Sequence, residues 1–243
     1  MQRSGLAIAV LLVTILLVAC VPAPASQPDT TISPVSAAPA GAAETGTPSF
    51  QVTVLPAPRP KGTLTLEEAL VQRRSVREFS TAQLTPAELG QLLWAAQGVT
   101  SPHGFRTAPS AGALYPLEVY AVTREGAYRY EPQAHRLILH LRGDLRAALY
   151  EAALRQDPVL NASAVIVIAA VYARTAQKYG EERSPRYVHL EAGHAAQNVL
   201  LQAVALDLGA VPIGAFSDEQ VRQVLELPSD QQPLYLIAVG HPV

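Results

Sequence analysis

The sequence predicts a domain of the α+β class, in which helices cover a sheet and one long helix lies buried. Helix and strand signals alternate irregularly along residues 61–243, whereas a parallel sheet is built from regular strand–helix repeats. Residues 164–171 form an apolar run without polar alternation, which is typical of a strand buried on both faces. Residues 186–208 form a helix that is apolar around much of its circumference from residue 195 on, and Gly209 is expected to end it.

Three further segments begin with helix-capping signals. Residues 65–68 form a capping box, in which a threonine and a glutamate satisfy two amide groups at the helix start, and this helix is expected to end near Arg74. Residues 85–88 form a second box with a proline at the first helical position, and Gly98 ends that helix. Residues 217–220 open a third helix, which carries its own apolar stripe.

Five segments carry strand signals. The second and third are close enough in sequence to form a hairpin, and the fourth is the buried central strand. Residues 61–243 thus suit one domain with a sizeable core. The five segments are residues 117–123, 127–130, 137–141, 164–172 and 234–240.

The first twenty residues have the features of a bacterial lipoprotein signal. Arg3 precedes an apolar stretch that is shorter than the roughly 20 residues of a spanning helix. Residues 17–20, Leu-Val-Ala-Cys, match the lipobox, in which the cysteine thiol takes a diacylglycerol and becomes the new N-terminus. Residues 1–19 are therefore expected to be the signal peptide and Cys20 the lipidated residue. A buried core helix with a packed cysteine and an uncleaved signal anchor are the alternatives.

Residues 20–60 are rich in Pro, Ala, Ser and Thr and contain few large apolar side chains. Such a segment buries too little surface to offset the entropy of ordering, so it is expected to be a disordered tether. It would hold the domain of residues 61–243 away from the bacterial cell membrane, on the extracytoplasmic side.

Cysteine count and charge exclude several kinds of site. Cys20 is the only cysteine, so the folded domain has no disulfide, no cysteine-based metal site and no cysteine nucleophile. The formal net charge is −2 and the basic residues are dispersed, which argues against nucleic acid as a partner. No metal site is predicted either: His189 and His194 are five residues apart and thus about 140° apart on a helix, whereas helical zinc motifs use a spacing of four.

Three segments have compositions suited to binding a ligand. Residues 73–77, Arg-Arg-Ser-Val-Arg, bring two guanidinium groups and a hydroxyl to the end of a helix, which suits a phosphate. A solvated basic helix end is the alternative. Residues 108–116 are small residues between two prolines, a rigid loop that can approach a flat ligand. Residues 209–216 expose backbone groups at a helix entrance. For both of these an ordinary connection is the alternative.

In this order, the segments resemble those of the nitroreductase superfamily of FMN-binding enzymes. They are most similar to its branch of SagB/ThcOx-type dehydrogenases, which oxidise peptide thiazolines and oxazolines to azoles. The resemblance covers nearly all of residues 64–243 and includes residues 189–198, which are similar to the branch's central helix. It implies the nitroreductase fold, a mostly antiparallel mixed sheet flanked by helices with a long buried central helix. It also implies a homodimer with each FMN between the subunits.

The resemblance assigns particular residues to FMN. Arg73, Arg74, Ser75 and Arg77 match the phosphate and ribityl motif, Pro109, Ser110, Ala111, Gly112 and Ala113 match the segment beside the isoalloxazine ring, and Pro212, Ile213, Gly214 and Ala215 match the segment that faces flavin N5.

The resemblance also implies a catalytic pair, Lys178 and Tyr179, which stands where the azole-forming branch has a Lys-Tyr pair. The reaction removes a proton from the ring carbon as hydride passes to flavin N5. A lysine desolvated in a pocket can act as the base, and a neighbouring phenol can orient or relay the proton. A surface lysine and a half-buried tyrosine in a flexible loop over residues 172–187 are the alternative.

Two departures from the family pattern bear on this assignment. Many nitroreductases complete the phosphate site with basic residues beyond the final strand, where this sequence offers only His241. Phosphate binding is therefore expected to rest on Arg73, Arg77 and His241. The flavin-contacting asparagine of the superfamily's central loop is replaced by Ala113, which shifts the expectation away from general nitroreductase activity.

The resulting hypothesis is an exported, lipid-anchored, FMN-dependent oxidoreductase that takes hydride from an azoline-like ring of a small molecule or peptide. An extracytoplasmic location favours a dehydrogenase or oxidase, because NAD(P)H is scarce outside the cell. Two alternatives stay open: a generic NAD(P)H-dependent nitro or quinone reductase, and a non-catalytic surface lipoprotein that retains the fold.

Overall fold

Seven strands form one sheet in the order β1-β4-β3-β2-β5-β7-β6, and every neighbouring pair is antiparallel. The structure is a computed structural model, and it describes residues 51–243. The predicted signal peptide, the lipidation at Cys20 and the tether up to residue 50 lie outside the described residues. The strands are β1 (Val52–Val54), β2 (Leu117–Val122), β3 (Gly126–Glu131), β4 (Arg136–Arg142), β5 (Ala164–Ala170), β6 (Gly209–Ile213) and β7 (Gln232–Gly240).

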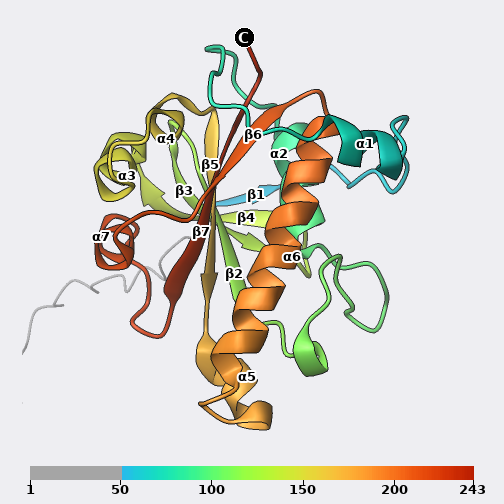
Figure 1. Ribbon diagram of the computed structural model, residues 1–243, viewed down its shortest axis with the longest axis vertical. Helices are drawn as coiled ribbons and strands as arrows, with labels where there is room; N and C mark the ends of the chain where they lie inside the picture. Colours follow the sequence, from blue (N-terminus) through green and yellow to red (C-terminus); the bar gives the residue numbers. More distant parts are fainter. Residues whose placement is uncertain (1–50) are drawn as a thin grey trace, which may run out of the picture. The chain divides into compact units, whose positions relative to one another are not determined.

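Helices cover both faces of this sheet (Figure 1). The predicted central strand β5 lies between β2 and β7 and is buried along its whole length. Alternate residues of a strand point to opposite faces, so Ile166 packs with α2 (Pro86–Gln97) and α6 (Ser184–Val204). Val165 packs on the other face with α3 (Arg146–Ala152), α4 (Asp157–Asn161) and α7 (Asp218–Val224). The predicted α+β class, with helices on both faces of a sheet and a long buried helix, is confirmed.

The helix starts follow the sequence closely. Thr65 and Thr85 each form the reciprocal capping box at the start of α1 (Leu66–Gln72) and α2. The Ser217 side chain accepts a hydrogen bond from the Gln220 amide at the start of α7. These caps depend on neighbouring residues alone, which explains why local sequence predicts them.

The long helix α6 is buried as predicted, but it ends four residues early. The chain turns at Asp207, whose φ is 57°, and the Leu208 amide bonds back to the Ala203 carbonyl. Gly209 is therefore the first residue of β6 and not the end of the helix. Pairing of residues 209–213 with β7 satisfies more backbone groups than one further helical turn would.

Two strands were not predicted, β1 and β6. Val52 pairs with Ile138 of β4, and Leu55 is buried in the core, so the prediction of a disordered tether is wrong for residues 51–55, which begin the domain before residue 61. Strand β6 contains Pro212, which cannot donate to a ladder and is tolerated here because β6 is the last strand of the sheet.

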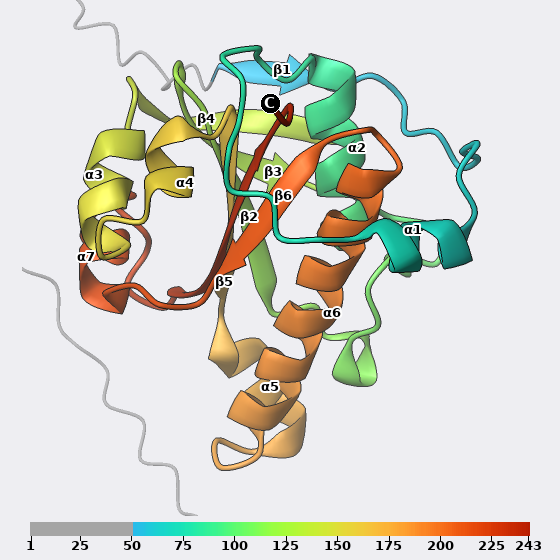
Figure 2. The same ribbon diagram turned by 45° about the horizontal axis from the view of Figure 1, so that its top comes forward.

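Residues 172–179 are helical, not part of a flexible loop. Helix α5 (Tyr172–Tyr179) ends at Gly180, whose φ is 77°, and α6 begins at Ser184. Figure 2 shows α5 packed beside the N-terminal end of α6. No helix within residues 51–243 is long and apolar enough to cross a membrane.

Candidate functional site

The predicted phosphate-binding residues lie on a segment that runs beside the edge strand β6. Helix α1 ends before its C-cap Arg73, and the Val76 amide donates to the Ala210 carbonyl of β6 at 3.0 Å. Residues 73–77 thus lie beyond the helix, and Arg73 and Arg77 do not share a helical face. Alternate residues of an extended chain point the same way, so Ser75 and Arg77, both exposed, lie on the side away from Val76.

Two of the predicted phosphate residues are engaged elsewhere. Arg74 Nη1 donates to the carbonyls of Val71 at 2.9 Å and Arg73 at 2.8 Å, so this guanidinium caps the end of α1. His241 Nε2 lies 3.8 Å from a carboxylate oxygen of Glu88, and a carboxylate there opposes binding of a phosphate. The structure supports neither Arg74 nor His241 as a phosphate ligand.

Arg73 and Arg77 remain available to an anion. Within residues 51–243 neither of them forms an ion pair with a carboxylate. Arg77 Nη1 makes one long contact, 3.4 Å, to the Ser75 carbonyl. Two free guanidinium groups beside a serine hydroxyl have the chemistry that a phosphate ester requires.

The segment predicted to face flavin N5 follows directly from β6. Gly214 and Ala215 are exposed, and their amides donate to no acceptor within the described part of the chain. The Ala215 carbonyl, by contrast, accepts a hydrogen bond from Gln156 Nε2 at 2.8 Å. The segment is thus held from behind and presents free backbone donors, next to the arginine segment along the same strand.

The predicted ring-side loop is a tight turn with left-handed backbone. The φ angles are 64° at Gly112, 55° at Ala113 and 48° at Tyr115. Glycine adopts this region freely, whereas alanine and tyrosine do so at a cost of about 1–3 kcal/mol each. Such a conformation persists only where its surroundings hold it.

Hydrogen bonds on three sides hold Tyr115 in this turn. Its amide donates to Ser110 Oγ at 2.9 Å, and its hydroxyl oxygen accepts from the Arg106 amide at 3.2 Å. Its carbonyl accepts from Arg174 Nη1 of α5 at 3.1 Å. The Arg106 guanidinium also stacks on the Tyr115 ring, 4.4 Å from its centroid. The turn is thereby tied to α5.

The structure brings the predicted catalytic pair onto this turn. A Cβ added at Gly112 would lie 3.1 Å from Lys178 Nζ and 3.2 Å from Tyr179 Oη, so a larger residue there would push both side chains away by a few tenths of an ångström. The Tyr179 ring in turn packs against Tyr187 of α6, with centroids 4.6 Å apart. Lys178 is exposed in the single chain, so the desolvation expected of a catalytic lysine is not supplied by this chain alone.

A buried polar cluster lies behind the turn, and no role was predicted for its residues. Arg106 Nη1 donates to Gln97 Oε1 of α2 at 2.8 Å, and Glu191 of α6 is 2% exposed. Burial raises the pKa of Glu191 to about 7, although the nearby Ser110 hydroxyl and the positive charge of Arg106 oppose this rise. A lone carboxylate on an apolar helix face is the signal in the sequence that could have found Glu191.

The phosphate-side residues and the ring-side residues lie at opposite ends of α6 (Figure 2). Tyr187, near the start of α6, contacts Tyr179, while α1 packs beside Leu201 and Ala205 near its end. At 1.5 Å per residue, roughly 25 Å of helix separates Tyr187 from Ala205. The two groups of residues therefore lie towards opposite ends of this helix.

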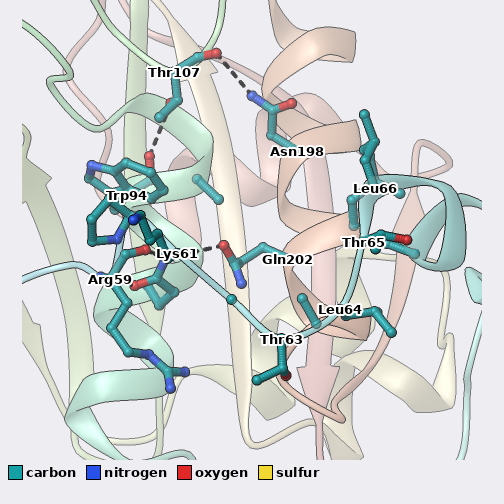
Figure 3. A pocket seen from close by; sticks show the side chains of 17 residues that line it. Arg59, Lys61, Thr63, Leu64, Thr65, Leu66, Trp94, Thr107, Asn198 and Gln202 are labelled. Atoms are coloured by element: carbon teal, nitrogen blue, oxygen red, sulfur yellow. Dashed lines mark hydrogen bonds between the residues drawn. The ribbon is translucent and has the colours of Figure 1, made fainter.

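A cavity of about 510 Å³ opens at the α1 end of α6. Figure 3 shows it between residues 59–66, Trp94 of α2 and Asn198 of α6. Its lining, within the described residues, includes Arg59 and Lys61 but no carboxylate. None of the predicted site residues lines it. The α6 residues that line the cavity are half-buried, because the rest of residues 51–243 covers that side of the helix only in part.

Comparison with known families decides what this fold is. The model of the nitroreductase family matches residues 70–241. The chain belongs to the nitroreductase family. Membership makes it an oxidoreductase by family, and it agrees with the resemblance that residues 64–243 carry.

Two relatives are similar to this nitroreductase-family chain in sequence. A protein of Methanocaldococcus jannaschii, whose name describes it as a nitroreductase, is 46% identical over 184 residues, which cover 73% of this chain and 91% of the relative. The trifolitoxin operon protein TfxC of Rhizobium leguminosarum bv. trifolii is 25% identical over 194 residues, which cover 71% of this chain and 54% of the relative.

Solved structures share the fold. A nitroreductase-type protein of Ralstonia eutropha has a TM-score of 0.71 and 31% identity, covering 79% of this chain and 90% of its own. The E. coli microcin synthetase McbBCD complex, with truncated pro-MccB17 bound, has a TM-score of 0.63 and 22% identity, covering 71% of this chain and 70% of its own. The second likeness shows the nitroreductase fold alone.

Proposed function

We propose that this chain is an FMN-dependent dehydrogenase or oxidase of the SagB/ThcOx type, which takes hydride from an azoline-like ring and works as a homodimer. The observation that carries the proposal is the contact of Lys178 and Tyr179 with Gly112, the closest-approach point of the ring-side turn. A basic amine and a phenol beside a flat-ligand surface are the groups that removal of a ring proton requires.

The residues of this chain that lie on the two segments and the turn fit FMN. Arg73, Ser75 and Arg77 would hold the phosphate and ribityl chain, the free amides of Gly214 and Ala215 would face the N5 edge, and Gly112 admits a flat ring. FMN, when bound, supplies the hydride acceptor.

Lys178 Nζ would accept the proton of the substrate ring carbon. The electron pair and the second hydrogen leave the substrate as hydride, and a ring double bond forms. Tyr179 Oη, on the same side of the turn, would orient or relay the proton. Because Lys178 is exposed in the single chain, its desolvation would come from the substrate and from a second subunit.

A peptide substrate is supported by the likenesses reported above. TfxC belongs by name to a trifolitoxin operon, and the E. coli microcin synthetase complex holds truncated pro-MccB17. The archaeal relative is named a nitroreductase, which favours the alternative of a generic NAD(P)H-dependent nitro or quinone reductase.

A homodimer is supported by the distance between the two groups and by exposed apolar side chains. Leu66 and Val71 of α1 are 60% and 71% exposed, and Leu190 of α6 is 55% exposed. Large apolar side chains gathered on a surface are typical of a face that a partner covers. In a twofold-symmetric pair, the phosphate-side residues of one subunit would meet the ring-side residues of the other.

Subunit complementation tests this arrangement. Arg73→Ala and Lys178→Ala proteins are unfolded together and refolded as a mixture. Turnover of a thiazoline peptide is measured with oxygen as acceptor, at an FMN concentration low enough that Arg73→Ala alone does not turn over. If each site uses both chains, mixed dimers hold one intact site, and about a quarter of wild-type activity returns. No recovery in a mixture shown to contain mixed dimers would place both residues in one subunit's site and overturn the shared site.

Two further results would replace the proposed reaction. Consumption of NAD(P)H with nitroaromatics or quinones, without azoline turnover, identifies a generic reductase. Colourless protein that takes up no FMN on dialysis identifies a non-catalytic module.

We also propose, from residues 17–20, that the mature protein is exported and anchored to the membrane through lipid on Cys20. Radiolabelled palmitate should enter the wild-type protein in a bacterial host, and Cys20→Ser should abolish both the label and recovery in the membrane fraction. Equal labelling of the two proteins would contradict lipid attachment at Cys20.

A further inference from the structure

The buried cluster behind the ring-side turn is the strongest feature that the proposed reaction leaves unused. It brings together Gln97 of α2, Arg106 of the loop between α2 and the turn, and Glu191 of α6. Gln97 is fully buried and Glu191 is 2% exposed. Removing a carboxyl or a guanidinium group from water costs free energy unless the group is paired and hydrogen-bonded.

Hydrogen bonding in this cluster is incomplete. Within residues 51–243, four buried side-chain polar atoms lack a partner, and three of them are here: Gln97 Nε2, Arg106 Nε and Glu191 Oε1. Each such atom destabilises the fold by about 1–3 kcal/mol. Concentration of unpaired atoms beside a strained turn is typical of functional positions.

Arg106 and Ser110 connect the cluster to the turn. Arg106 donates its amide to the Tyr115 hydroxyl and stacks on that ring, while Ser110, which influences Glu191, accepts the Tyr115 amide. The turn then meets Lys178 and Tyr179 at Gly112. Side chains from two helices and one loop thus support the surface on which the proposed catalytic pair rests.

We propose that Glu191 is a positioning residue: its buried carboxyl, with Arg106, fixes the Ser110–Tyr115 turn and thereby the place of Lys178 above Gly112. The inference rests on the proposed function for its catalytic meaning, but the link from Glu191 to the turn does not depend on flavin or turnover.

The charged groups around Glu191 are few. Arg106 faces it from the loop, and α2 contributes only the neutral Gln97. Arg106 in turn is influenced by Tyr115, by Glu118 of β2 and by Arg174 of α5. The carboxyl has a higher pKa in the folded protein than when exposed, so opening of this region becomes easier as pH rises towards 7.

Hydrogen exchange of the full-length protein, read by mass spectrometry on a peptide spanning residues 108–116, tests the first link. The protected amides are those of Ala113, Leu114 and Tyr115. After correction for intrinsic exchange, wild-type protection should fall by up to about tenfold per pH unit between pH 5 and 7 and then level off. Glu191→Gln should remove this dependence, and Glu191→Ala should lower protection at every pH.

The second link is tested by the rate at which an acetylating reagent labels Lys178 in the same proteins. Loosening of the turn in Glu191→Ala should raise this rate several-fold. Tyr120→Phe is the matched control, because it removes the buried hydrogen bond to Gln231 on the opposite face of the sheet and should change neither readout.

Three results would overturn the inference: unchanged exchange in Glu191→Ala, wild-type pH dependence in Glu191→Gln, or a loosened turn with unchanged Lys178 labelling. Absence of azoline turnover in the wild type would instead overturn the proposed function, and both readouts here would still decide the role of Glu191.

Discussion

The two ends of α6 carry two half-sites that are built in different ways. At the C-terminal end, Arg73 and Arg77 stand on an irregular segment, mostly exposed and without ion pairs among residues 51–243. At the N-terminal end, a strained turn is held by Arg106, Arg174 and a buried carboxyl. Exposed arginine side chains can adjust to a bound anion, whereas proton transfer requires the reacting atoms to be fixed to within a fraction of an ångström. The contrast follows from what each end would do.

The largest expected effect is on the fixed end, at Lys178. Lys178→Ala should lower azoline turnover by at least about 100-fold, because general-base catalysis contributes that much or more, and FMN content should be unchanged. Steady-state kinetics with the flavin absorbance of each preparation measures both. Gln177→Ala, its exposed neighbour on α5, is the control. Wild-type turnover in Lys178→Ala would remove this residue from the reaction.

The phosphate end should show a smaller effect on FMN affinity. Arg73→Ala should raise the FMN dissociation constant about 10- to 100-fold, the loss expected for a charge-assisted hydrogen bond. Arg74→Ala removes the same charge from a side chain that caps α1, so it should change affinity by less than about threefold. Fluorescence titration of apoprotein gives both constants. Equal losses would mean that net charge matters and position does not.

At the fixed end, Glu191→Gln should alter stability with pH. Burial raises the pKa of Glu191 from 4.5 to about 7, so the folded state binds more protons between these values and stability falls as pH rises through that window. Glu191→Gln should therefore be more stable than wild type by up to about 3 kcal/mol at pH 8, and the advantage should disappear towards pH 4.5. Urea unfolding at several pH values measures it, with Glu181→Gln as the exposed control. A constant difference at all pH values would contradict it.

The smallest expected effect concerns the support of the N5 segment. Gln156 Nε2 donates to the carbonyls of Ala153 and Ala215, each at 2.8 Å. Gln156→Ala should weaken FMN binding about threefold to tenfold, the value of one neutral hydrogen bond, and leave azoline turnover by flavin-saturated protein nearly unchanged. A drop in turnover as large as that of Lys178→Ala would mean that the two ends are not separable.

Local sequence determined the elements whose causes are local. The capping boxes at Thr65 and Thr85 and the apolar strand at residues 164–170 were predicted and are present. Strands β1 and β6 were missed because their pairing partners, β4 and β7, are distant in sequence. No helix was predicted over residues 172–179, because their polar composition hides a short helix that packs on α6.

The candidate site divides in the same way. Sequence named Arg73, Lys178 and Gly112 through motifs, since each motif is a run of neighbouring residues. It could not show that Arg74 bonds to the end of α1 or that His241 lies beside Glu88, because which way a side chain points depends on its partners.

By itself, then, the sequence indicated the family, and through the family resemblance it proposed the segments for a flavin and a lysine–tyrosine pair for chemistry. Only the tertiary structure decided that this pair rests on Gly112, that Glu191 lies behind the turn, and that α6 separates the two half-sites. The physical reason is that motifs record which groups a ligand needs, while distance, burial and strain arise from contacts between residues far apart in the chain.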